Sequence, residues 1–206
     1  MKVGIVNYGM GNLGSVRRAL EDLGAQPFIA NHPATLHEAN RIVLPGVGAF
    51  PDAMALLASG GWTEVLHRLV ADGRPLLGIC LGMQMLARTG TEGGENTGLG
   101  FIDGTIRRLD ELGCTARIPH VGWNELTFDD SDPLFAHIPQ RSDFYFVHSY
   151  AFDAATCPAA SGTTDYGVPV VATVRSGHVW GTQFHPEKSS KAGRQLLRNF
   201  LEVHAC

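Results

Sequence analysis

The sequence contains few cysteines and slightly more acidic than basic residues. Its 206 residues include four cysteines, Cys80, Cys114, Cys157 and Cys206, with no C-x-x-C spacing, and 16 Lys and Arg against 20 Asp and Glu. The nine histidines form no H-E-x-x-H pattern. These absences argue against a disulfide framework, a zinc site and a nucleic-acid-binding face. We therefore expect no metal ion, no nucleic acid and a reducing, cytoplasmic setting.

Long apolar runs and linkers are absent as well. No apolar stretch approaches the roughly 20 residues of a membrane span, and the opening "MKVGIVNYGM" enters a strand pattern with no room for a signal peptide. No repeat, low-complexity tract or linker divides the chain. We therefore expect one domain over residues 1–206 that enters no membrane.

The first half of the chain alternates strand and helix patterns. Leu13, Val16, Leu20 and Leu23 fall at helical spacing before Gly24, Pro51 suits a helix first turn, and "WTEVLHRLVADG" is a helix pattern. Short apolar runs between them predict buried strands, in "KVGIVNY", "QPFIA", "RIVLPG" and "RPLLGIC". Strands that alternate with helices indicate βαβ units and a parallel sheet covered on both faces.

The second half is richer in strand patterns. They lie in "GLGFIDGTIRRL", "RIPHVGWNELTF", "DFYFVHSYAF", "VPVVATVRSG" and "HVWGTQFHP", the last two joined by a hairpin at Ser176-Gly177, before a C-terminal helix pattern in "KAGRQLLRNFLEVHAC". We expect an α/β fold with a mostly parallel central sheet, flanking helices and antiparallel strands added in the second half.

Cys80 lies between two glycines in "RPLLGICLGMQMLARTG", where a buried strand pattern meets an apparent amphipathic helix. A sharp strand-to-helix turn exposes the side chain above the sheet edge, and the free N–H groups of a helix N-terminus favour a thiolate there. The pattern predicts a nucleophile. Taken alone, it is equally typical of a small buried cysteine between packing glycines.

A base for this nucleophile is indicated by "GTQFHPEKSS". Pro186 favours an extended conformation at His185, so the side chain of Glu187, two residues on, points to the same side and can orient the imidazole. A cysteine, a histidine base and an orienting carboxylate form a catalytic triad. Without Cys80, the same tripeptide would be an ordinary surface turn.

An oxyanion-binding site is predicted where "LPGVGAF" ends a parallel strand. The backbone N–H groups at Val47 and Gly48, together with that of Leu81 after the nucleophile, could stabilise the tetrahedral intermediate. Loss of one such donor typically costs about 2.7 to 4 kcal/mol of transition-state stabilisation. Without the other two motifs, this segment would be read as a turn.

Six separated motifs give the chain a family resemblance. "GICLGMQ" and "FHPEKS" look like the class I (triad) glutamine amidotransferase family. Within that family, "NYGMGNLGSV", "LPGVGAF", "PHVGWN" and "YFVHSY" resemble the glutaminase subunits of imidazole glycerol phosphate synthases, in the same order along the chain. The resemblance implies the family's three-layer α/β fold.

The resemblance also implies a reaction. Cys80 would attack the side-chain carboxamide of glutamine, His185 would carry the proton to the leaving ammonia, and Glu187 would hold His185. A γ-glutamyl thioester would then be hydrolysed to glutamate. By similarity, glutamine would be bound by Gly48, Gln84, and the backbone of His148, Ser149 and Tyr150.

A partner is implied in the same way. In the family, ammonia passes to a HisF-type (β/α)8-barrel cyclase, which forms a heterodimer with the glutaminase. In histidine biosynthesis, the cyclase converts the ribulosyl aminoimidazole carboxamide nucleotide PRFAR to imidazole glycerol phosphate and AICAR. Asn12, Trp123 and Lys188 lie in motifs that resemble the partner-facing surface. No cofactor is expected, because "GMGNLGS" lacks both G-x-G-x-x-G and Walker spacing.

Two alternatives from other classes stay open. One is a glutaminase or γ-glutamyl hydrolase of another pathway, such as the glutaminase of pyridoxal phosphate synthesis. The other is a non-catalytic subunit that keeps the fold and only regulates a partner. Stimulation of ammonia release by the cyclase would distinguish the first, and the absence of a covalent adduct with a glutamine-like electrophile would favour the second.

Overall fold

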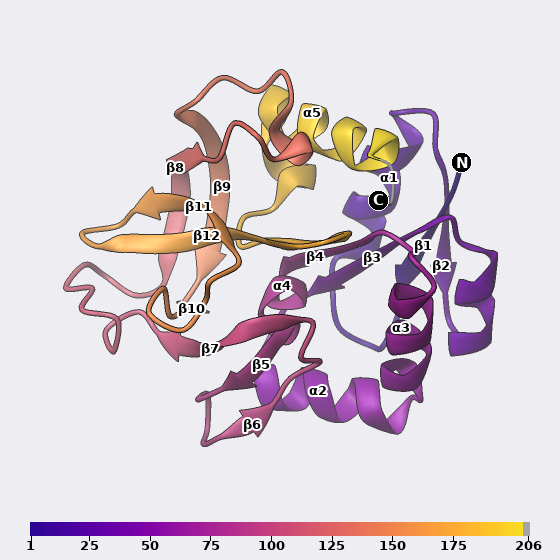
Figure 1. Ribbon diagram of the computed structural model, residues 1–206, viewed down its shortest axis with the longest axis horizontal. Helices are drawn as coiled ribbons and strands as arrows, with labels where there is room; N and C mark the ends of the chain where they lie inside the picture. The colour runs from indigo at the N-terminus through magenta and orange to yellow at the C-terminus, as the bar shows by residue number, and fades with distance from the viewer. Residues whose placement is uncertain (204–206) are drawn as a thin grey trace.

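The first half of the chain forms the predicted alternation of strands and helices in the computed structural model, which describes residues 1–203 (Figure 1). Its strands are β1 (Lys2–Val6), β2 (Gln26–Ala30), β3 (Arg41–Gly46) and β4 (Leu76–Cys80). Its helices are α1 (Leu13–Glu21), α2 (Phe50–Ser59) and α3 (Trp62–Ala71), with a short 3-10 helix η1 (Pro33–Glu38) that the sequence did not predict. Pro51 lies in the first turn of α2, as expected.

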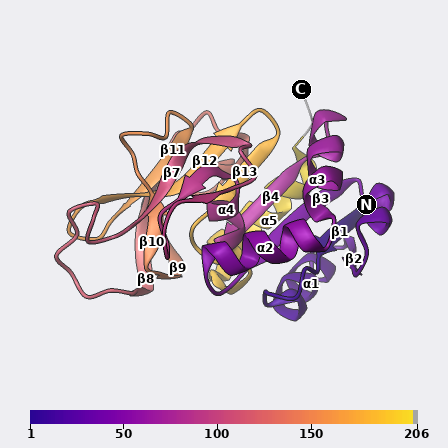
Figure 2. The ribbon, with the colours of Figure 1, turned by 90° about the horizontal axis from the view of Figure 1, so that it is seen from below.

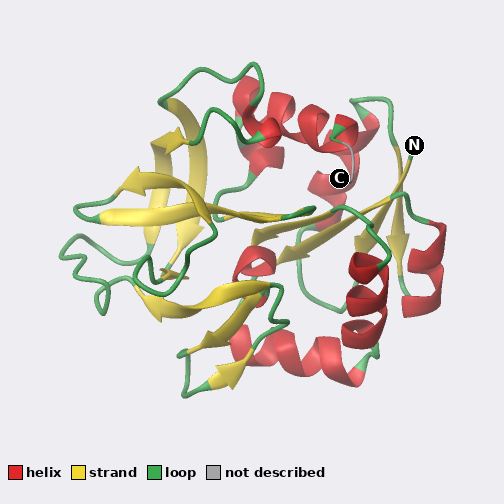
Figure 3. Ribbon diagram, viewed as in Figure 1, coloured by secondary structure: helices red, strands yellow, loops and turns green. Residues whose placement is uncertain are grey.

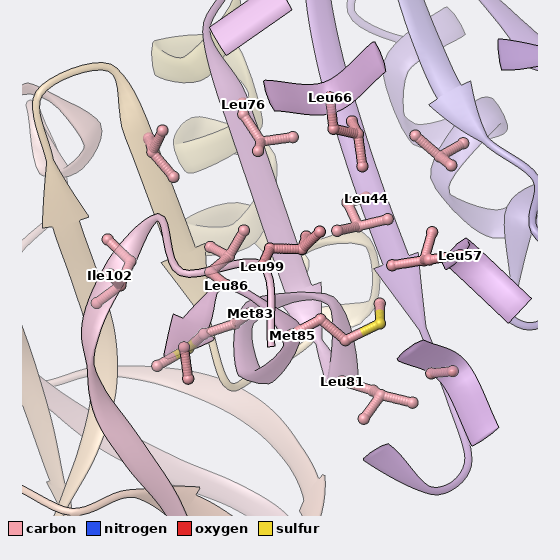
Figure 4. Close-up of a cluster of buried hydrophobic side chains, with 14 of the residues drawn as sticks. Leu44, Leu57, Leu66, Leu76, Leu81, Met83, Met85, Leu86, Leu99 and Ile102 are labelled. Atoms are coloured by element: carbon pink, nitrogen blue, oxygen red, sulfur yellow. The ribbon is translucent and has the colours of Figure 1, made fainter. Parts of the chain in front are cut away.

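Side chains of these strands alternate between two buried layers. Val43, Leu77 and their neighbours pack with α1 and with the C-terminal helix α5 (Ser190–Glu202). Leu44 and Leu76 face the other way, toward α2 and α3; Figure 4 shows this second cluster. Figures 1 and 2 place the two pairs of helices on opposite faces of the sheet. The predicted three-layer α/β fold is confirmed.

The second half of the chain is mainly β structure (Figure 3). Its strands are β5 (Ala87–Gly90), β6 (Asn96–Thr97), β7 (Ile102–Arg108), β8 (His120–Phe128), β9 (Ser142–His148), β10 (Tyr150–Phe152), β11 (Ala160–Asp165), β12 (Pro169–Ser176) and β13 (Val179–Thr182). Short 3-10 helices are η2 (Pro133–Phe135) and η3 (Pro186–Lys188).

The main sheet joins both halves of the chain, in the strand order β2-β1-β3-β4-β13-β12-β11-β8-β9. From β2 to β13 each strand pairs with its neighbour in parallel. From β13 to β9 each pairing is antiparallel. The parallel part therefore has five strands, and four more strands are added to it by antiparallel pairing.

In the second half, the strands β5, β6 and β11 were not predicted, and two predicted segments differ in detail. The run "DFYFVHSYAF" is divided at Ser149, because β9 ends in the main sheet whereas β10 joins a second sheet of order β10-β7-β5-β6. In the β12–β13 hairpin, Ser176 pairs with Val179, so Gly177 and His178 form the turn in place of Ser176-Gly177. Gly177 has φ +57, which glycine adopts readily.

The prediction of an amphipathic helix after Cys80 is wrong. Helix α4 (Leu81–Met85) has only five residues, all of them buried, and the chain then turns into β5. Leu81, Met83 and Met85 all lie in the core shown in Figure 4, so no face of this helix is left for solvent. Such a short helix has a weak macrodipole, and only the N–H groups of its first turn are available to an anion.

No helix within residues 1–203 is long and apolar enough to span a membrane. Cys80, Cys114 and Cys157 are buried free thiols. Cys206, the fourth cysteine, lies outside the described residues.

Candidate active site

Strand order brings the predicted motifs together at one edge of the sheet. Gly46, at the end of β3, is the register partner of Cys80, at the end of β4. On the other side of β4, Thr182 of β13 pairs with Ile79. The segments that follow these three parallel strands therefore meet at their carboxyl ends, where ligand sites form in open α/β sheets.

The turn at Cys80 is sharp and strained. Cys80 has φ 56 and ψ −114, a conformation that costs a non-glycine residue roughly 1–3 kcal/mol. The two neighbouring glycines are required by contact: a Cβ on Gly82 would collide with the carbonyl oxygen of Leu44, and one on Gly78 would lie 2.7 Å from the carbonyl oxygen of Gly82. The predicted elbow is present, and it depends on close backbone packing.

His185 and Glu187 are in direct contact. Nδ1 of His185 lies 2.9 Å from Oε1 of Glu187, and the two side chains are 4% and 1% exposed. His185 has an extended backbone, but Pro186 then starts the 3-10 helix η3, so a turn rather than an extended chain places Glu187 beside the ring. The N–H of His185 donates to the carbonyl oxygen of Tyr145 at 2.9 Å, which ties His185 to β9.

The electrostatic surroundings favour a protonated His185. Burial by itself lowers the pKa of His185, but the contacts and charges of Cys80 and Glu187 outweigh it and raise this pKa to about 9. Nε2 of His185 is buried and has no hydrogen-bond partner within residues 1–203. At neutral pH the site can therefore hold an imidazolium between a sulfur and a carboxylate.

The Cys80 sulfur has two further polar neighbours. It lies 3.7 Å from the carbonyl oxygen of Val147 and 3.8 Å from Nε2 of Gln183. Gln183 is fully buried, and its Oε1 accepts a hydrogen bond from Nε2 of Gln84 at 3.0 Å. Sequence reasoning missed Gln183, although it lies two residues before His185 in the same motif.

A cavity of about 350 Å³ opens beside the sulfur. Three residues that the sequence did not indicate contribute to its wall, namely Glu92, Pro119 and Val147. Oε2 of Glu92 also accepts a hydrogen bond from the N–H of Phe50 at 2.7 Å, in the first turn of α2. The other residues lining the cavity were all expected in the site: Val47, Gly48, Cys80, Leu81, Gln84, His148, Ser149, Tyr150 and His185.

Gln84 is oriented by its neighbours. Its Nε2 donates to the carbonyl oxygen of Tyr150 at 2.9 Å as well as to Gln183. Both amide hydrogens are thereby used, so Oε1 is the atom of this side chain that can accept a hydrogen bond from a ligand in the cavity.

The three residues expected at a partner surface lie outside the cavity. Trp123 is 53% exposed and packs edge-on against Tyr145, with ring centroids 6.0 Å apart. Nζ of Lys188 lies 5.8 Å from the centroid of the same Tyr145 ring. Asn12 lies elsewhere, at the N-terminus of α1, where its Oδ1 accepts from the N–H of Ser15 at 3.3 Å. The structure thus groups two of the three residues.

Exposed apolar side chains surround Trp123. Val121 is 55% exposed, and its register partner Val147 is 37% exposed and also lines the cavity. Val47, in the predicted oxyanion segment, is 44% exposed. An apolar surface therefore extends from β8 to the mouth of the cavity. The alternation of side chains in "YFVHSY" is the sequence signal for an outward-facing Val147.

Comparison with known proteins relates the whole chain to one family. The family model described as glutamine amidotransferase class-I matches residues 4–203. A protein of Desulfitobacterium hafniense (strain DSM 10664 / DCB-2), named imidazole glycerol phosphate synthase subunit HisH, is 47% identical over 96% of this chain and 92% of its own. A protein of the same name from Bacillus subtilis (strain 168) is 45% identical over 98% and 97%.

Solved structures agree with this fold. A structure titled PurLQS from Thermotoga maritima has a TM-score of 0.78 at 19% identity and covers 98% of this chain and 97% of its own. A crystal structure of a glutamine amidotransferase has a TM-score of 0.76 at 21% identity and covers 97% of both chains. At these identities the likeness concerns the fold alone.

Proposed function

The chain belongs to the class-I glutamine amidotransferase family, and from that premise we propose that it is the glutaminase subunit of an imidazole glycerol phosphate synthase in histidine biosynthesis. One observation carries the chemistry: the buried His185–Glu187 pair contacts a strained cysteine at the edge of a cavity. The specific pathway rests on relatives of that name at 43 to 47% identity over nearly the whole chain.

The proposed reaction begins with the Cys80 thiolate. Its sulfur attacks the γ-carboxamide carbon of glutamine, and the N–H groups of Leu81 and of the Val47–Gly48 segment stabilise the resulting oxyanion. The C–N bond then breaks as the His185 imidazolium gives its proton to the leaving nitrogen, which departs as ammonia. Neutral His185 next takes a proton from water, and the hydroxide attacks the thioester carbon. Glutamate leaves and Cys80 is restored.

The cavity has a suitable size and charge for glutamine. A volume of about 350 Å³ is at the small end of the range for ligand pockets, which suits a single amino acid. We assign Glu92 to the α-ammonium group, because it supplies a carboxylate to the lining of the cavity. Oε1 of Gln84 can accept a further hydrogen bond, and the backbone of His148, Ser149 and Tyr150 completes the site.

The ammonia requires a protected path, because free ammonia is protonated in water. We propose that the apolar surface formed by Val47, Val121, Trp123 and Val147 contacts a HisF-type (β/α)8-barrel cyclase, with Lys188 at its margin, and that Asn12 makes a separate contact with the same partner. The exposed apolar area leads directly to the cavity mouth, as expected of a surface that a partner covers. The cyclase would use the ammonia to convert PRFAR to imidazole glycerol phosphate and AICAR.

A glutaminase assay with and without the purified cyclase and its nucleotide tests this function. Gly48 has φ +104, so the segment around Val47 can adopt backbone states that other residues avoid. We expect the lone chain to work slowly and the liganded cyclase to increase its rate by about 10² to 10³, the effect of one good oxyanion donor. Equal rates with and without the cyclase would contradict this regulation, and no ammonia release in either case would contradict the proposed activity.

A further inference from the structure

A row of three polar side chains, the half-buried Asn124 and the buried His120 and His148, connects strand β8 with the wall of the cavity. Nδ1 of His120 lies 3.1 Å from Nε2 of His148, and Nδ1 of His148 lies 2.8 Å from the carbonyl oxygen of Tyr150. At the other end, Nδ2 of Asn124 lies 3.4 Å from Nε2 of His120. His120 and His148 are only 2% and 5% exposed. The proposed reaction uses neither ring.

The contact between His148 and the carbonyl oxygen of Tyr150, at the inner end of this row of side chains, determines the direction of the hydrogen bonds along it. The carbonyl oxygen of Tyr150 can only accept, so Nδ1 of His148 carries a proton. In a neutral ring, Nε2 of His148 is then an acceptor, which requires Nδ1 of His120 to be the donor. Nε2 of His120 is left as an acceptor in its turn.

The outer end leads to the same direction independently. Nδ2 of Asn124 donates to the carbonyl oxygen of Asp165 at 2.7 Å, while its Oδ1 accepts from the N–H of Glu125 at 2.9 Å. These two contacts fix the orientation of the amide, and its nitrogen therefore points to His120 as a donor. One arrangement, with both histidines neutral and protonated on Nδ1, satisfies every member of the row.

The surroundings keep both rings neutral and in place. Burial lowers the pKa of His120 to about 4. Burial likewise lowers that of His148 to about 3; the nearby His120 and His185 rings act in the same direction, and the hydrogen bond to Tyr150 opposes them. The His120 ring is held between those of Phe146, 4.7 Å away, and Tyr166, 3.9 Å away.

The row ends at a carbonyl that is shared with the catalytic side of the site. The Tyr150 oxygen also accepts from Nε2 of Gln84, and Gln84 is linked through Gln183 to the Cys80 sulfur. Residues 148–150 are where the chain leaves the main sheet and joins the second one, and they line the cavity. The backbone that faces the ligand is therefore fixed from behind by this row.

We propose that Asn124, His120 and His148 form a one-directional hydrogen-bond relay that positions the 148–150 backbone for binding glutamine. The three are positioning residues, and the inference rests on the proposed glutaminase function. Because this wall contacts the substrate in the ground state and in the transition state alike, loosening it raises KM and leaves kcat nearly unchanged.

A pair of variants at one position tests the relay. His120→Leu removes the donor, whereas His120→Asn retains an amide nitrogen at the same number of bonds from the backbone as Nδ1. Both variants lose the stacking on Phe146 and Tyr166, so both lose stability. Measured with the cyclase complex, KM for glutamine rises about five- to tenfold in His120→Leu, the effect of one hydrogen bond, and stays within about twofold of wild type in His120→Asn.

A second measurement uses the unaltered protein. With ¹⁵N-labelled histidine, nuclear magnetic resonance should show His120 and His148 as neutral rings protonated on Nδ1 between about pH 6 and 8, where a free histidine titrates. Protonation of either ring on Nε2, or KM values that rise equally in the two variants of an active enzyme, would overturn the relay alone. A wild-type complex that releases no ammonia from glutamine would overturn the proposed function, and the positioning role with it.

Discussion

The two walls of the cavity are built on different principles. The wall from the parallel half of the sheet, with Cys80 and the Val47–Gly48 segment, depends on backbone geometry: a strained φ at Cys80 and glycines without room for a Cβ. The other wall, which comes from the second half of the chain and contains His185 and residues 148–150, depends on buried polar side chains that hydrogen-bond one another. Cys80, the proposed nucleophile, is thus fixed by packing, whereas His185 and the 148–150 backbone are fixed by hydrogen bonds.

The largest effect is expected at the nucleophile itself. Cys80→Ala removes the atom that forms the thioester, so glutamine turnover should fall by about 10⁴ or more. Cys157→Ser is the matched control, because burial raises the pKa of the Cys157 thiol to about 11 and keeps it from acting as a nucleophile. Cys114→Ser and Cys206→Ser should likewise stay active. Ammonia release by Cys80→Ala at the wild-type rate would remove Cys80 from the mechanism.

On the opposite wall, Glu187→Gln should lower kcat by about 10² to 10⁴ without abolishing it, because His185 keeps its base function but loses its fixed tautomer and charge partner. The charge of Glu187 helps to raise the pKa of His185 to about 9, so the alkaline decline of kcat/KM should move to lower pH in the variant. Profiles of rate against pH for the two proteins measure both effects. A variant as fast as wild type would exclude Glu187 from catalysis.

The free energy of unfolding tests whether the wall that contains Cys80 depends on close backbone packing. A Cβ on Gly82 would meet the Leu44 carbonyl oxygen, so Gly82→Ala should lower the free energy of unfolding by about 1–3 kcal/mol, the range for overpacking. In Gly14→Ala, within α1, the added carbon meets nothing within 4 Å, and alanine should stabilise the helix by up to about 1 kcal/mol. Denaturant unfolding of both variants measures the contrast, and equal changes would argue against tight packing at the elbow.

The last comparison concerns acid. The pKa values of His120 and His148 are lowered to about 4 and about 3. Below about pH 6.5 these two histidines are therefore protonated in the unfolded chain but still neutral in the folded chain. The free energy of unfolding consequently decreases as the pH falls. Each ring adds about 1.4 kcal/mol per pH unit to this slope. His185, whose pKa is raised to about 9, contributes stability that is complete below about pH 6.5 and is lost as pH rises through 9, so it does not affect the acid range.

His120→Asn isolates this effect. The variant has one titrating ring fewer, so its free energy of unfolding should fall less steeply than that of wild type between about pH 6 and 4.5. The difference between the two slopes corresponds to the binding of one proton. Unfolding in denaturant at several pH values gives the two slopes. Parallel slopes would show that His120 is not buried as a neutral ring.

The parallel half was the more predictable part of the fold because its signals are local. Strands such as β2 and β3 coincide with single apolar runs, and α1 follows from leucine spacing. In the other half, β11 has the small, polar sequence "ASGTTD" and is a strand only because it pairs with β8 and β12. The transfer of β10 to the second sheet likewise depends on tertiary pairing.

The same distinction holds for the site. The elbow at Cys80 and the His185–Glu187 pair are contained in short motifs, and the structure brings both together. Contacts that join distant parts of the chain were missed: Gln183 is 103 residues from Cys80, and Glu92 is 42 residues from Phe50. A single sequence contains no local pattern for such pairs, because the fold alone makes them neighbours.

Covalent labelling tests the central claim, that Cys80 is the nucleophile of a glutaminase, most directly. The protein in complex with the cyclase is incubated with a glutamine analogue that carries an electrophilic carbon in place of the carboxamide, then digested and examined by mass spectrometry. We predict one label per chain, on the peptide containing Cys80, that excess glutamine suppresses and that Cys80→Ala lacks. A label on Cys114 or Cys157 instead, or no label in an intact complex, would contradict the account.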